Sequence, residues 1–537
     1  MFGGVSPIDS MRSIPVSSLT SYWNEFEVRE EDLEFIYNLL LDKGIPLTTR
    51  EMAEALVGRR LARLEKERER EAESGIRQYL PGDEYQVGEQ VVFPALGSAV
   101  GTVTAVRPGQ NPDLGPFDVI DVAFGDDGRH REFAARFSDH KMNRAPIPDP
   151  ASEPPASVES VMSSQGRIVE DRLIQRLNQA TDIVRIARRW FPRALLVDIH
   201  EGHLNLAEAV LDVANGGPLP TSAFMQHLGL GPSVDASLAE FSMDYALQED
   251  NRFDEVGPAG EVVWYLRRLE PVEVLYPPPR LEYKPVPFDR ALLTPPLLEL
   301  ERQLDDENSP LDETDEGIEE VTLAILFPHW RVGTLPLSSR LRAMFPTAYE
   351  APRIRLILID GHTGDNFPGW VVREQRFVYG MDEWYRRHQV PAGGLVRIKR
   401  GAKPGEVVVE AVDQRRRSEW IRTLTINAAG QIGFTMLKQA VGTAYDELMV
   451  VGVGDKVALD EAWLRGPQRR MTTEQLVSHV FRELAKLNPQ SAVHAQALYS
   501  GVNTLRRLAP GPIFAELLTR SHYVHVGDLY WRLADVG

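Results

Sequence analysis

Hydrophobic positions recur at helical spacing in three separate regions of the chain. In residues 32–41 the apolar side chains fall on one helix face, and a turn with a Thr cap leads into a second helix ending near residue 56. Residues 206–214 and 476–484 show the same spacing, and each is followed by a turn and two further helical segments. This recurrence predicts a duplicated helical module rather than a solenoid, whose period would be constant.

Two of these regions continue into a short hairpin. Residues 252–266 turn at Pro258-Ala259-Gly260-Glu261, and residues 523–533 turn at Gly527-Asp528. Three helices followed by a hairpin predict a winged helix that includes a leading helix in residues 165–275, and another winged helix in residues 471–537. Residues 22–78 are expected to form only a helix-turn-helix-like unit.

Alternating apolar residues in short runs between turns predict strands elsewhere. Residues 80–145 have this pattern, which predicts a small β-barrel, and a segment rich in Pro, Ser and Ala follows at residues 146–160 as a linker. Residues 415–466 mix strand and helix patterns and are expected to be an α+β connector, to which we assign no function. The fold class predicted for the whole chain is therefore α+β and multidomain.

Residues 334–400 contain a distinctive order of motifs. Leu335-Pro336-Leu337 is followed by Met344-Phe345-Pro346, a strand at 353–359, a turn at 360–365, a Trp-bearing strand at 370–373, Trp384-Tyr385, and Leu395-Val396-Arg397. This order resembles the DNA-binding pseudobarrel family of plant transcription factors and restriction-enzyme effector domains. Gly394 stands where the family pattern has Asp. The resemblance implies a pseudobarrel at residues 321–412, with Trp370 and Trp384 in its core.

Two weaker resemblances concern the other predicted domains. The arrangement G-G-x-L-P-T at residues 216–221, with Trp264 in the hairpin, resembles winged helices of the bacterial RNA polymerase delta subunit and of chromatin-associated proteins. The order of residues 88–106 looks like Tudor- or KOW-type barrels. The third helical segment of the first winged helix, residues 239–244, is acidic, which indicates contact with protein instead of DNA.

Composition and charge narrow the class of protein. The 537 residues contain no cysteine, which excludes disulfides, thiolate nucleophiles and Cys-ligated metal sites. No apolar run approaches the ~20 residues of a membrane helix, and residues 1–4 lack the blocks of a signal peptide. We expect a cytoplasmic protein with no membrane partner.

The formal net charge of −19 is unevenly distributed. Residues 299–320 are dense in acids, with Arg302 as the only base, and are predicted to be a flexible acidic linker. Basic clusters lie at residues 185–193, 397–403, 415–417 and 465–470. Such clusters can meet a polyanion, and the alternative is that they are solvated faces.

Candidate catalytic chemistry is sparse. His200 and His203 are spaced to ligate a metal, but Gly202 and the lack of a clear third ligand argue against a site there. No phosphate-binding glycine loop and no G-x-S-x-G elbow is present. We expect a non-enzymatic protein with no catalytic residues, no cofactor and no metal, although a metal site built from scattered Asp and Glu stays open.

The leading hypothesis is a multi-module protein that binds double-stranded DNA in transcription regulation or genome defence. The pseudobarrel resemblance implies two arms that straddle the major groove. Their DNA-binding residues would be Ser338, Ser339, Arg340 and Arg342 in the first arm, and Arg373, Gln375 and Arg376 in the second. Arg suits guanine or phosphate, and Gln suits adenine. The alternatives are ordinary polar loops in an acidic scaffold bound to RNA polymerase or another protein, or a recognition subunit for a separate nuclease.

Overall fold

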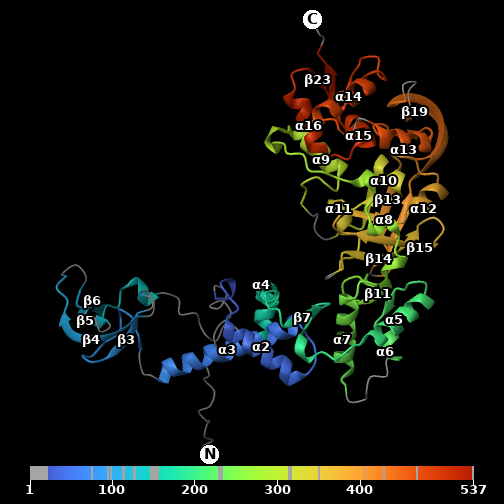
Figure 1. Ribbon diagram of the computed structural model, residues 1–537. Helices are drawn as coiled ribbons and strands as arrows, with labels where there is room; N and C mark the ends of the chain where they lie inside the picture. Colours follow the sequence, from blue (N-terminus) through green and yellow to red (C-terminus); the bar gives the residue numbers. More distant parts are fainter. Residues whose placement is uncertain are drawn as a thin grey trace, which may run out of the picture. The chain divides into compact units, whose positions relative to one another are not determined.

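The computed structural model describes residues 22–73, 77–93, 96, 99–111, 115–124, 129–144, 157–227, 234–312, 317–348, 351–403, 405–426, 430–466 and 470–534. It is an α+β protein with several separate sheets, as the sequence predicts at this coarse level (Figure 1). The chain divides into two compact units, residues 1–196 and 197–537.

The first unit is built around a helical module that is interrupted by a sheet. Its helical elements and their sheet are α2 (Glu30–Lys43), β1 (Leu47–Thr48), α3 (Thr49–Glu73), α4 (Val158–Leu177), β7 (Ile183–Ile186) and β8 (Arg189–Pro192), with sheet order β1-β8-β7. Between α3 and α4 lies the five-stranded sheet β2 (Arg77–Gln78), β3 (Gln90–Phe93), β4 (Ala99–Pro108), β5 (Asp118–Phe124) and β6 (Arg129–Ala135). The helix α3 packs directly against α4.

This arrangement corrects the expected boundary at residue 165, which falls inside α4. The expected leading helix and the hairpin β7–β8 complete the N-terminal module, because β8 pairs with β1 from residues 47–48. The 80–145 sheet is thus inserted into that module. The sequence pattern indicated two separate modules because residues 80–145, which have a strand pattern, lie between the two halves.

The second unit begins with a module of the same topology. Its elements are α5 (Glu201–Val213), β9 (Leu219–Pro220), α6 (Ser222–Met225), α7 (Ala236–Glu249), β10 (Phe253–Glu255) and β11 (Val263–Leu266), with sheet order β10-β11-β9. A third copy at the C-terminus comprises α14 (Thr473–Ala485), β22 (Val493–His494), α15 (Ala495–Leu505), α16 (Pro510–Thr519), β23 (Tyr523–Gly527) and β24 (Tyr530–Leu533), in the order β22-β24-β23.

A tryptophan occupies the same place in all three modules. Trp190, Trp264 and Trp531 lie in the second hairpin strand, opposite the short first strand. Trp190 Nε1 donates to Thr49 Oγ1 at 2.9 Å, and Trp264 Nε1 donates to Thr221 Oγ1 at 3.0 Å. A buried indole N–H needs an acceptor, which explains the Thr that follows the short strand in the first two modules and the L-x-T pattern that they share. The third copy has Ala495 at that position.

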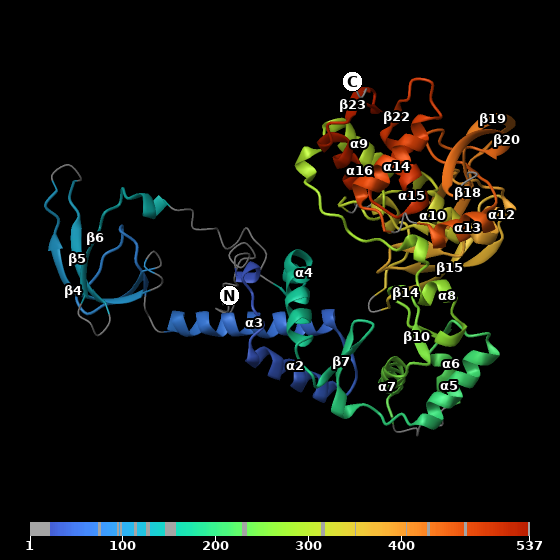
Figure 2. The ribbon, with the colours of Figure 1, turned by 45° about the horizontal axis from the view of Figure 1, so that its top comes forward.

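A seven-stranded mixed sheet forms the centre of the second unit and curls into a half-barrel (Figure 2). Its order is β12-β17-β18-β14-β15-β16-β13, antiparallel except for the β14–β18 pair. The strands are β12 (Glu320–Ala324), β13 (Thr334–Pro336), β14 (Arg353–Asp360), β15 (Asn366–Val372), β16 (Phe377–Tyr379), β17 (Leu395–Arg400) and β18 (Val407–Ala411). Short helices α10 (Phe327–Val332), α11 (Ser339–Arg342) and α12 (Asp382–Arg387) interrupt it.

The half-barrel has its own apolar core. Ile354, Leu358, Val396 and Val409 are among its fully buried residues, and Trp384 belongs to the same cluster. Trp370 is also buried, but it packs on the other side of the sheet against Tyr265 of the preceding module. The predicted place in the core is therefore confirmed for Trp384 and wrong for Trp370, which is buried against the preceding module.

The remaining elements join the half-barrel to the C-terminal module. They are α8 (Val272–Leu275), α9 (Pro295–Leu304), the long strands β19 (Asp413–Ile426) and β20 (Ile432–Thr443), β21 (Gly452–Val453) and α13 (Lys456–Arg465). The helix α16 packs against α9, and Phe288 fills the space above Gly511, where a Cβ would approach the ring to 2.3 Å. Short 3-10 turns occur at Lys141–Arg144, Arg193–Leu195, Arg267–Leu269, Pro279–Leu281 and Arg290–Leu292.

Candidate nucleic-acid interface

The two predicted arms lie side by side at one end of the half-barrel. Strand β13 pairs with β16 so that Pro336 faces Phe377, and Leu337 N then donates to Arg376 O at 2.8 Å. This register places the segment that follows β13 next to the turn between β15 and β16. The structure thus brings all seven predicted residues to a single end of the sheet, although 31 positions separate Arg342 from Arg373 in the sequence.

The serines of the first arm do not project into solvent. Ser338 and Ser339 are buried, and each hydroxyl donates to the Asp305 carboxylate at 2.5 Å. Ser338 also caps α11 by accepting from Leu341 N. Arg340 is half-buried and pairs with the same carboxylate, with Nε 2.9 Å from Oδ2. Their hydroxyls therefore fasten the loop to Asp305 and are not available to DNA in this arrangement.

Several arginines at this end bond to main-chain carbonyls. Arg373 donates to Ala348 O at 2.9 Å, Arg376 to Glu307 O at 2.8 Å, and Arg400 to Ala343 O at 2.6 Å. Arg342 donates to Leu337 O at 3.3 Å. We call Arg340, Arg342, Arg373, Arg376 and Arg400 the arginine end.

Three members of the arginine end keep their full charge. Arg373, Arg376 and Arg400 are exposed, and within the described part of the chain no carboxylate lies within salt-bridge distance of them. A carbonyl fixes a guanidinium in place without cancelling its charge, so the positive potential stays available to a polyanion. The turn also carries exposed Gln375 and one acid, Glu374.

Arg400 was not assigned to the site from sequence. It was recognised only as part of the basic cluster at residues 397–403. In the structure Arg397 and Lys399 of that cluster pair with Glu320 and Glu410 on neighbouring strands. Arg400 lies at the strand end, where the alternation of β17 directs it away from those acids.

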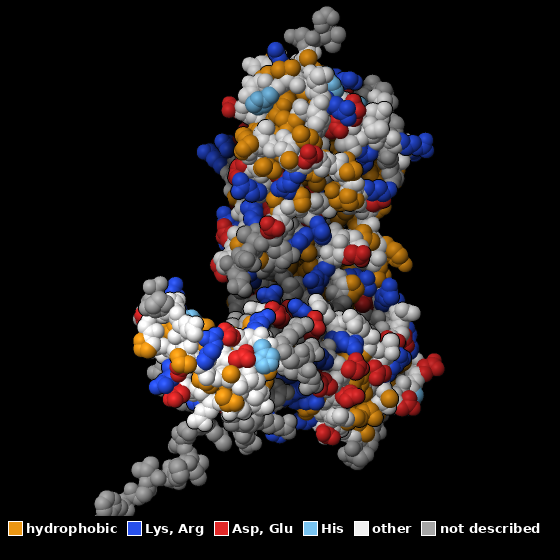
Figure 3. Space-filling view, turned by 90° about the vertical axis from the view of Figure 1, so that its left-hand side faces the viewer, with side chains coloured by type: hydrophobic (Ala, Val, Ile, Leu, Met, Phe, Trp, Pro, Cys, Tyr) orange, Lys and Arg blue, Asp and Glu red, His pale blue; other side chains and the backbone are white. Residues whose placement is uncertain are grey.

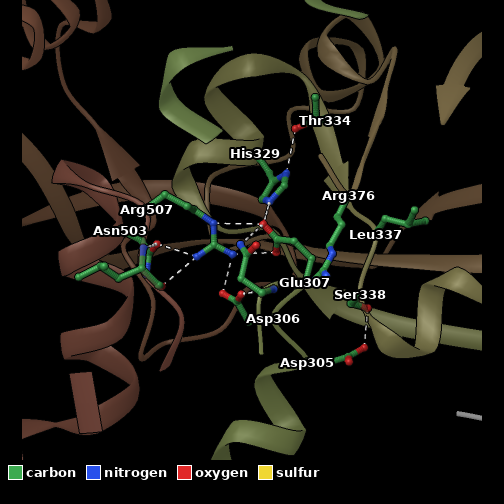
Figure 4. Close-up of polar contacts among 12 residues, drawn as sticks. Asp305, Asp306, Glu307, His329, Thr334, Leu337, Ser338, Arg376, Asn503 and Arg507 are labelled. Atoms are coloured by element: carbon green, nitrogen blue, oxygen red, sulfur yellow. Dashed lines mark hydrogen bonds and ion pairs between the residues drawn. The ribbon is translucent and has the colours of Figure 1, made fainter. Parts of the chain in front are cut away.

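A buried charge network holds the loop that carries Asp305 (Figure 4). Arg507 Nη2 lies 2.6 Å from Asp306 Oδ2 and 2.7 Å from Glu307 Oε2. His329 Nε2 lies 3.0 Å from Glu307 Oε1, and its Nδ1 lies 2.9 Å from Thr334 Oγ1. The side chains of Asp306, Glu307, His329 and Arg507 are almost completely buried.

The network contradicts the expected flexible linker at residues 299–320. Residues 295–304 form α9, with the Glu301 side chain fully buried, and Asp305, Asp306 and Glu307 are all buried after it. Residues 313–316 lie outside the described residues. The acids are ordered because Arg507, two hundred positions away, supplies their counter-charge. Acidic composition alone therefore did not indicate exposure.

Burial and charge act in opposite directions on Glu307. Burial alone would raise the pKa of its carboxyl, but Arg507 and His329 outweigh that effect and hold the pKa below its ordinary value. Glu307 is therefore ionised at neutral pH. Its main-chain carbonyl is the acceptor for Arg376, so the network also supports the turn of the second arm.

The third helices of the two modules in the second unit offer no cations. The helix α7 contains Glu240, Asp244 and Glu249 but neither Lys nor Arg. The helix α16 is mostly buried beneath residues from the 288–304 region, and its only charged residue is Glu516. On the face drawn in Figure 3, acidic and basic side chains are interspersed. The arginine end differs in that three of its cations have no salt-bridge partner among the residues that the structure describes.

Other candidate chemistry is sparse among the described residues. No group of three or more His, Cys, Asp or Glu side chains is arranged to hold a metal ion among them. The rings of His200 and His203 stack with centroids 3.6 Å apart, and burial together with His200 lowers the pKa of His203. No helix in the described ranges has the length and apolarity needed to cross a membrane.

Comparison with known proteins adds no relative. No family model, curated protein or solved structure matches the chain.

Proposed function

We propose that this chain is a non-enzymatic, multi-module protein that binds double-stranded DNA through the arginine end. The observation that carries the proposal is the convergence of two distant segments whose exposed arginines bond to carbonyls. Interactions with DNA phosphates are driven by cations that release condensed counterions. Arg373, Arg376 and Arg400 meet that requirement, and Gln375 between them can read a base edge.

The arrangement of the domains also supports this proposed function. Two loops meet at one end of the half-barrel, where the pseudobarrel resemblance implies two arms, and each of the three helix–hairpin modules combines three helices with a hairpin, as expected of winged helices. A cytoplasmic role in transcription regulation or genome defence follows from that combination. If the protein is a recognition subunit, the cleavage would belong to a separate nuclease.

The backbone of Arg376 offers additional support. Its φ of +58° lies in the left-handed region, which costs a residue with a side chain about 1–2 kcal/mol. Glycine would occupy this turn position with less strain. A strained residue at a charged turn is common at functional sites, which favours a role for the Arg376 side chain beyond folding.

Binding of the full chain to a fluorescein-labelled 20-base-pair duplex tests the proposal. Anisotropy is measured at 50 and 200 mM salt for the wild type, Arg373→Ala and Arg376→Gly. We expect both variants to bind more weakly, and each lost phosphate contact to flatten the slope of log affinity against log salt by about one unit. Arg376→Gly keeps the turn conformation, so its loss reports the side chain.

Arg465→Ala is the matched control. Arg465 is 80 % exposed on α13 and pairs with Glu461 four residues earlier, so it is a cation of ordinary surface type. Its removal should leave duplex binding unchanged. Equal weakening by all three variants would mean that only overall charge matters, and unchanged binding by Arg373→Ala and Arg376→Gly would contradict the proposal.

A protein scaffold, for instance one associated with RNA polymerase, is the second candidate. The acidic α7 and the buried α16 favour it, because the helices that usually enter a DNA groove are unsuited to do so here. The two candidates separate in the same experiment. A scaffold would bind no duplex at either salt concentration, and its arginine variants would behave as the wild type does.

A further inference from the structure

The long hairpin β19–β20 carries an exposed tryptophan on a basic sheet face. We call this hairpin the arch; Figure 1 draws β19 as a long curved strand. Trp420 is 65 % exposed, and Lys438 lies directly opposite it on β20. Ser418 and Ala440 form the next pair and are exposed as well. An indole this exposed on regular strand is unusual, because burial of an aromatic ring normally stabilises a fold.

The opposite face of the arch is firmly packed. Ile421 and Val441 are buried there with Val451, and Tyr445 donates a hydrogen bond to Glu419. Near the hairpin end, Leu424 and Ile432 belong to the core of the C-terminal region. The arch is therefore anchored on one face and at its hairpin end, and it leaves uncovered the part of the other face that carries Ser418, Trp420, Lys438 and Ala440.

Arg422 also anchors the arch. Its Nη1 donates to the carbonyls of Leu448 and Met449, both at 2.9 Å, and to that of Glu447 at 3.2 Å. These bonds tie the middle of β19 to the segment before β21. A ligand that binds the uncovered part would not have to order the arch first, which lowers the entropic cost of binding.

The charge of the arch is opposite to that of the chain. Residues 413–443 contain five Lys and Arg and two acids, a local balance of +3 in a chain of net charge −19. Both acids are engaged, Asp413 by His362 at 3.3 Å and Glu419 by Arg417 at 3.3 Å. Arg415, Arg416 and Lys438 are exposed, and none of them has a carboxylate within salt-bridge distance in the described part of the chain.

We propose that the arch binds single-stranded nucleic acid, with a base stacked on Trp420 and the neighbouring phosphates held by Lys438, Arg415 and Arg416. Proteins that bind single strands combine cations along the backbone path with aromatic rings on which bases stack. A duplex does not suit this face, because its bases are already stacked on one another. The site is separate from the arginine end and goes beyond binding of duplex DNA.

The test uses the full chain with fluorescein-labelled (dT)15 and (U)15 in 50 mM salt. Trp420→Ala should weaken the binding of (dT)15 about tenfold, because stacking of a base on an aromatic ring is strong and tolerant of sequence. Trp420→Phe should retain most of the affinity. Comparison of (dT)15 with (U)15 shows whether DNA or RNA is preferred.

Two further variants separate stacking from nonspecific loss. Tyr276→Ala removes another highly exposed aromatic ring, 73 % exposed after α8, and should have no effect. The double change Arg415→Ala and Arg416→Ala should flatten the salt slope by about 1.4 units, as expected for two phosphate contacts on a single strand. Circular dichroism melts confirm that each variant is folded.

The same variants should affect single-strand binding and duplex binding differently. Arg373→Ala should bind (dT)15 as the wild type does, and Trp420→Ala should retain duplex binding. The proposal is overturned if the wild type does not bind (dT)15 or (U)15, or if folded Trp420→Ala binds both as tightly as the wild type. Loss of single-strand binding by Arg373→Ala alone would place the single strand on the arginine end instead.

Discussion

The arginine end and the buried charge network both contain arginine, but the guanidinium has a different environment in each. Arg507 is enclosed and paired with two carboxylates, whereas Arg373 is exposed and bonded to one carbonyl. In the network Arg507 contacts both carboxylates, so little of its charge acts at a distance. At Arg373, Arg376 and Arg400 the neutral carbonyl partners leave the charge available. The partner of an arginine, rather than the number of arginines, therefore distinguishes a structural site from a binding site.

The two regions are also physically connected. Asp305, Asp306 and Glu307 are consecutive in the sequence. Asp305 contacts Ser338, Asp306 contacts Arg507, and Glu307 contacts both Arg507 and His329. The network thus anchors the loop against which the first arm is fastened. Removal of one partner of a buried ion pair is strongly destabilising, whereas the intact pair contributes little net stability. We therefore interpret the network as an arrangement that fixes the position of one loop.

The largest expected effect comes from breaking the network. Arg507→Met leaves Asp306 and Glu307 buried without their cation, which should lower the free energy of unfolding by about 3–5 kcal/mol. Urea unfolding monitored by circular dichroism measures it. Arg465→Met is the matched control and should change stability by less than about 0.5 kcal/mol. Comparable losses in the two variants would remove the contrast between buried and exposed arginines.

A change in pH is expected to have a smaller effect on the stability of the network. The pKa of Glu307 is lower in the folded than in the unfolded protein, so its contribution is present above the unfolded value of about 4.3 and is lost as pH falls below it. Glu307→Gln should therefore be less stable than the wild type at pH 7, and the difference should shrink as the pH is lowered from 5 to 3. A difference independent of pH would show that ionisation of Glu307 does not stabilise the fold.

The exposure of Arg340 lies between that of buried Arg507 and that of exposed Arg373. Replacement of Arg340 should therefore cause a loss of stability between the losses expected for those two residues. Arg340 is half-buried and pairs with Asp305, so Arg340→Ala should lower stability by about 1–3 kcal/mol by removing a charged hydrogen bond from a buried carboxylate. Arg373→Ala should cost less than about 0.5 kcal/mol. Thermal or urea unfolding of the two variants checks the order. The reverse order would contradict the assignment of Arg373 as a binding residue.

Local pattern predicted much of the fold. The helix near residues 32–41, the strand at 353–359 and the hairpins around Trp264 and Trp531 all lie where the spacing placed them. These elements depend on periodicity over ten or so residues, which a single sequence displays. The repeated module was also recognisable, because a Gly turn and a Thr accompany the short strand in the first two copies.

Long-range pairing could not be predicted from the same information. The acids at 305–307 were expected in solvent because their counter-charge, Arg507, is two hundred positions distant. The first module was divided because an inserted sheet separates its second and third helices. Ser338 and Ser339 follow a strand and have loop composition, yet Asp305 buries them. Each error concerns which segments meet, not which element forms.

Hydrogen exchange of the full chain with and without a 20-base-pair duplex tests the central claim most directly. Exchange reports local opening and shielding of backbone amides. The account predicts that added duplex slows exchange in the peptides that contain residues 373–376 and 337–343. Exchange in the arch and in α16 should be unchanged. Protection confined to residues 183–193 or 413–443, with no change at the arginine end, would contradict it.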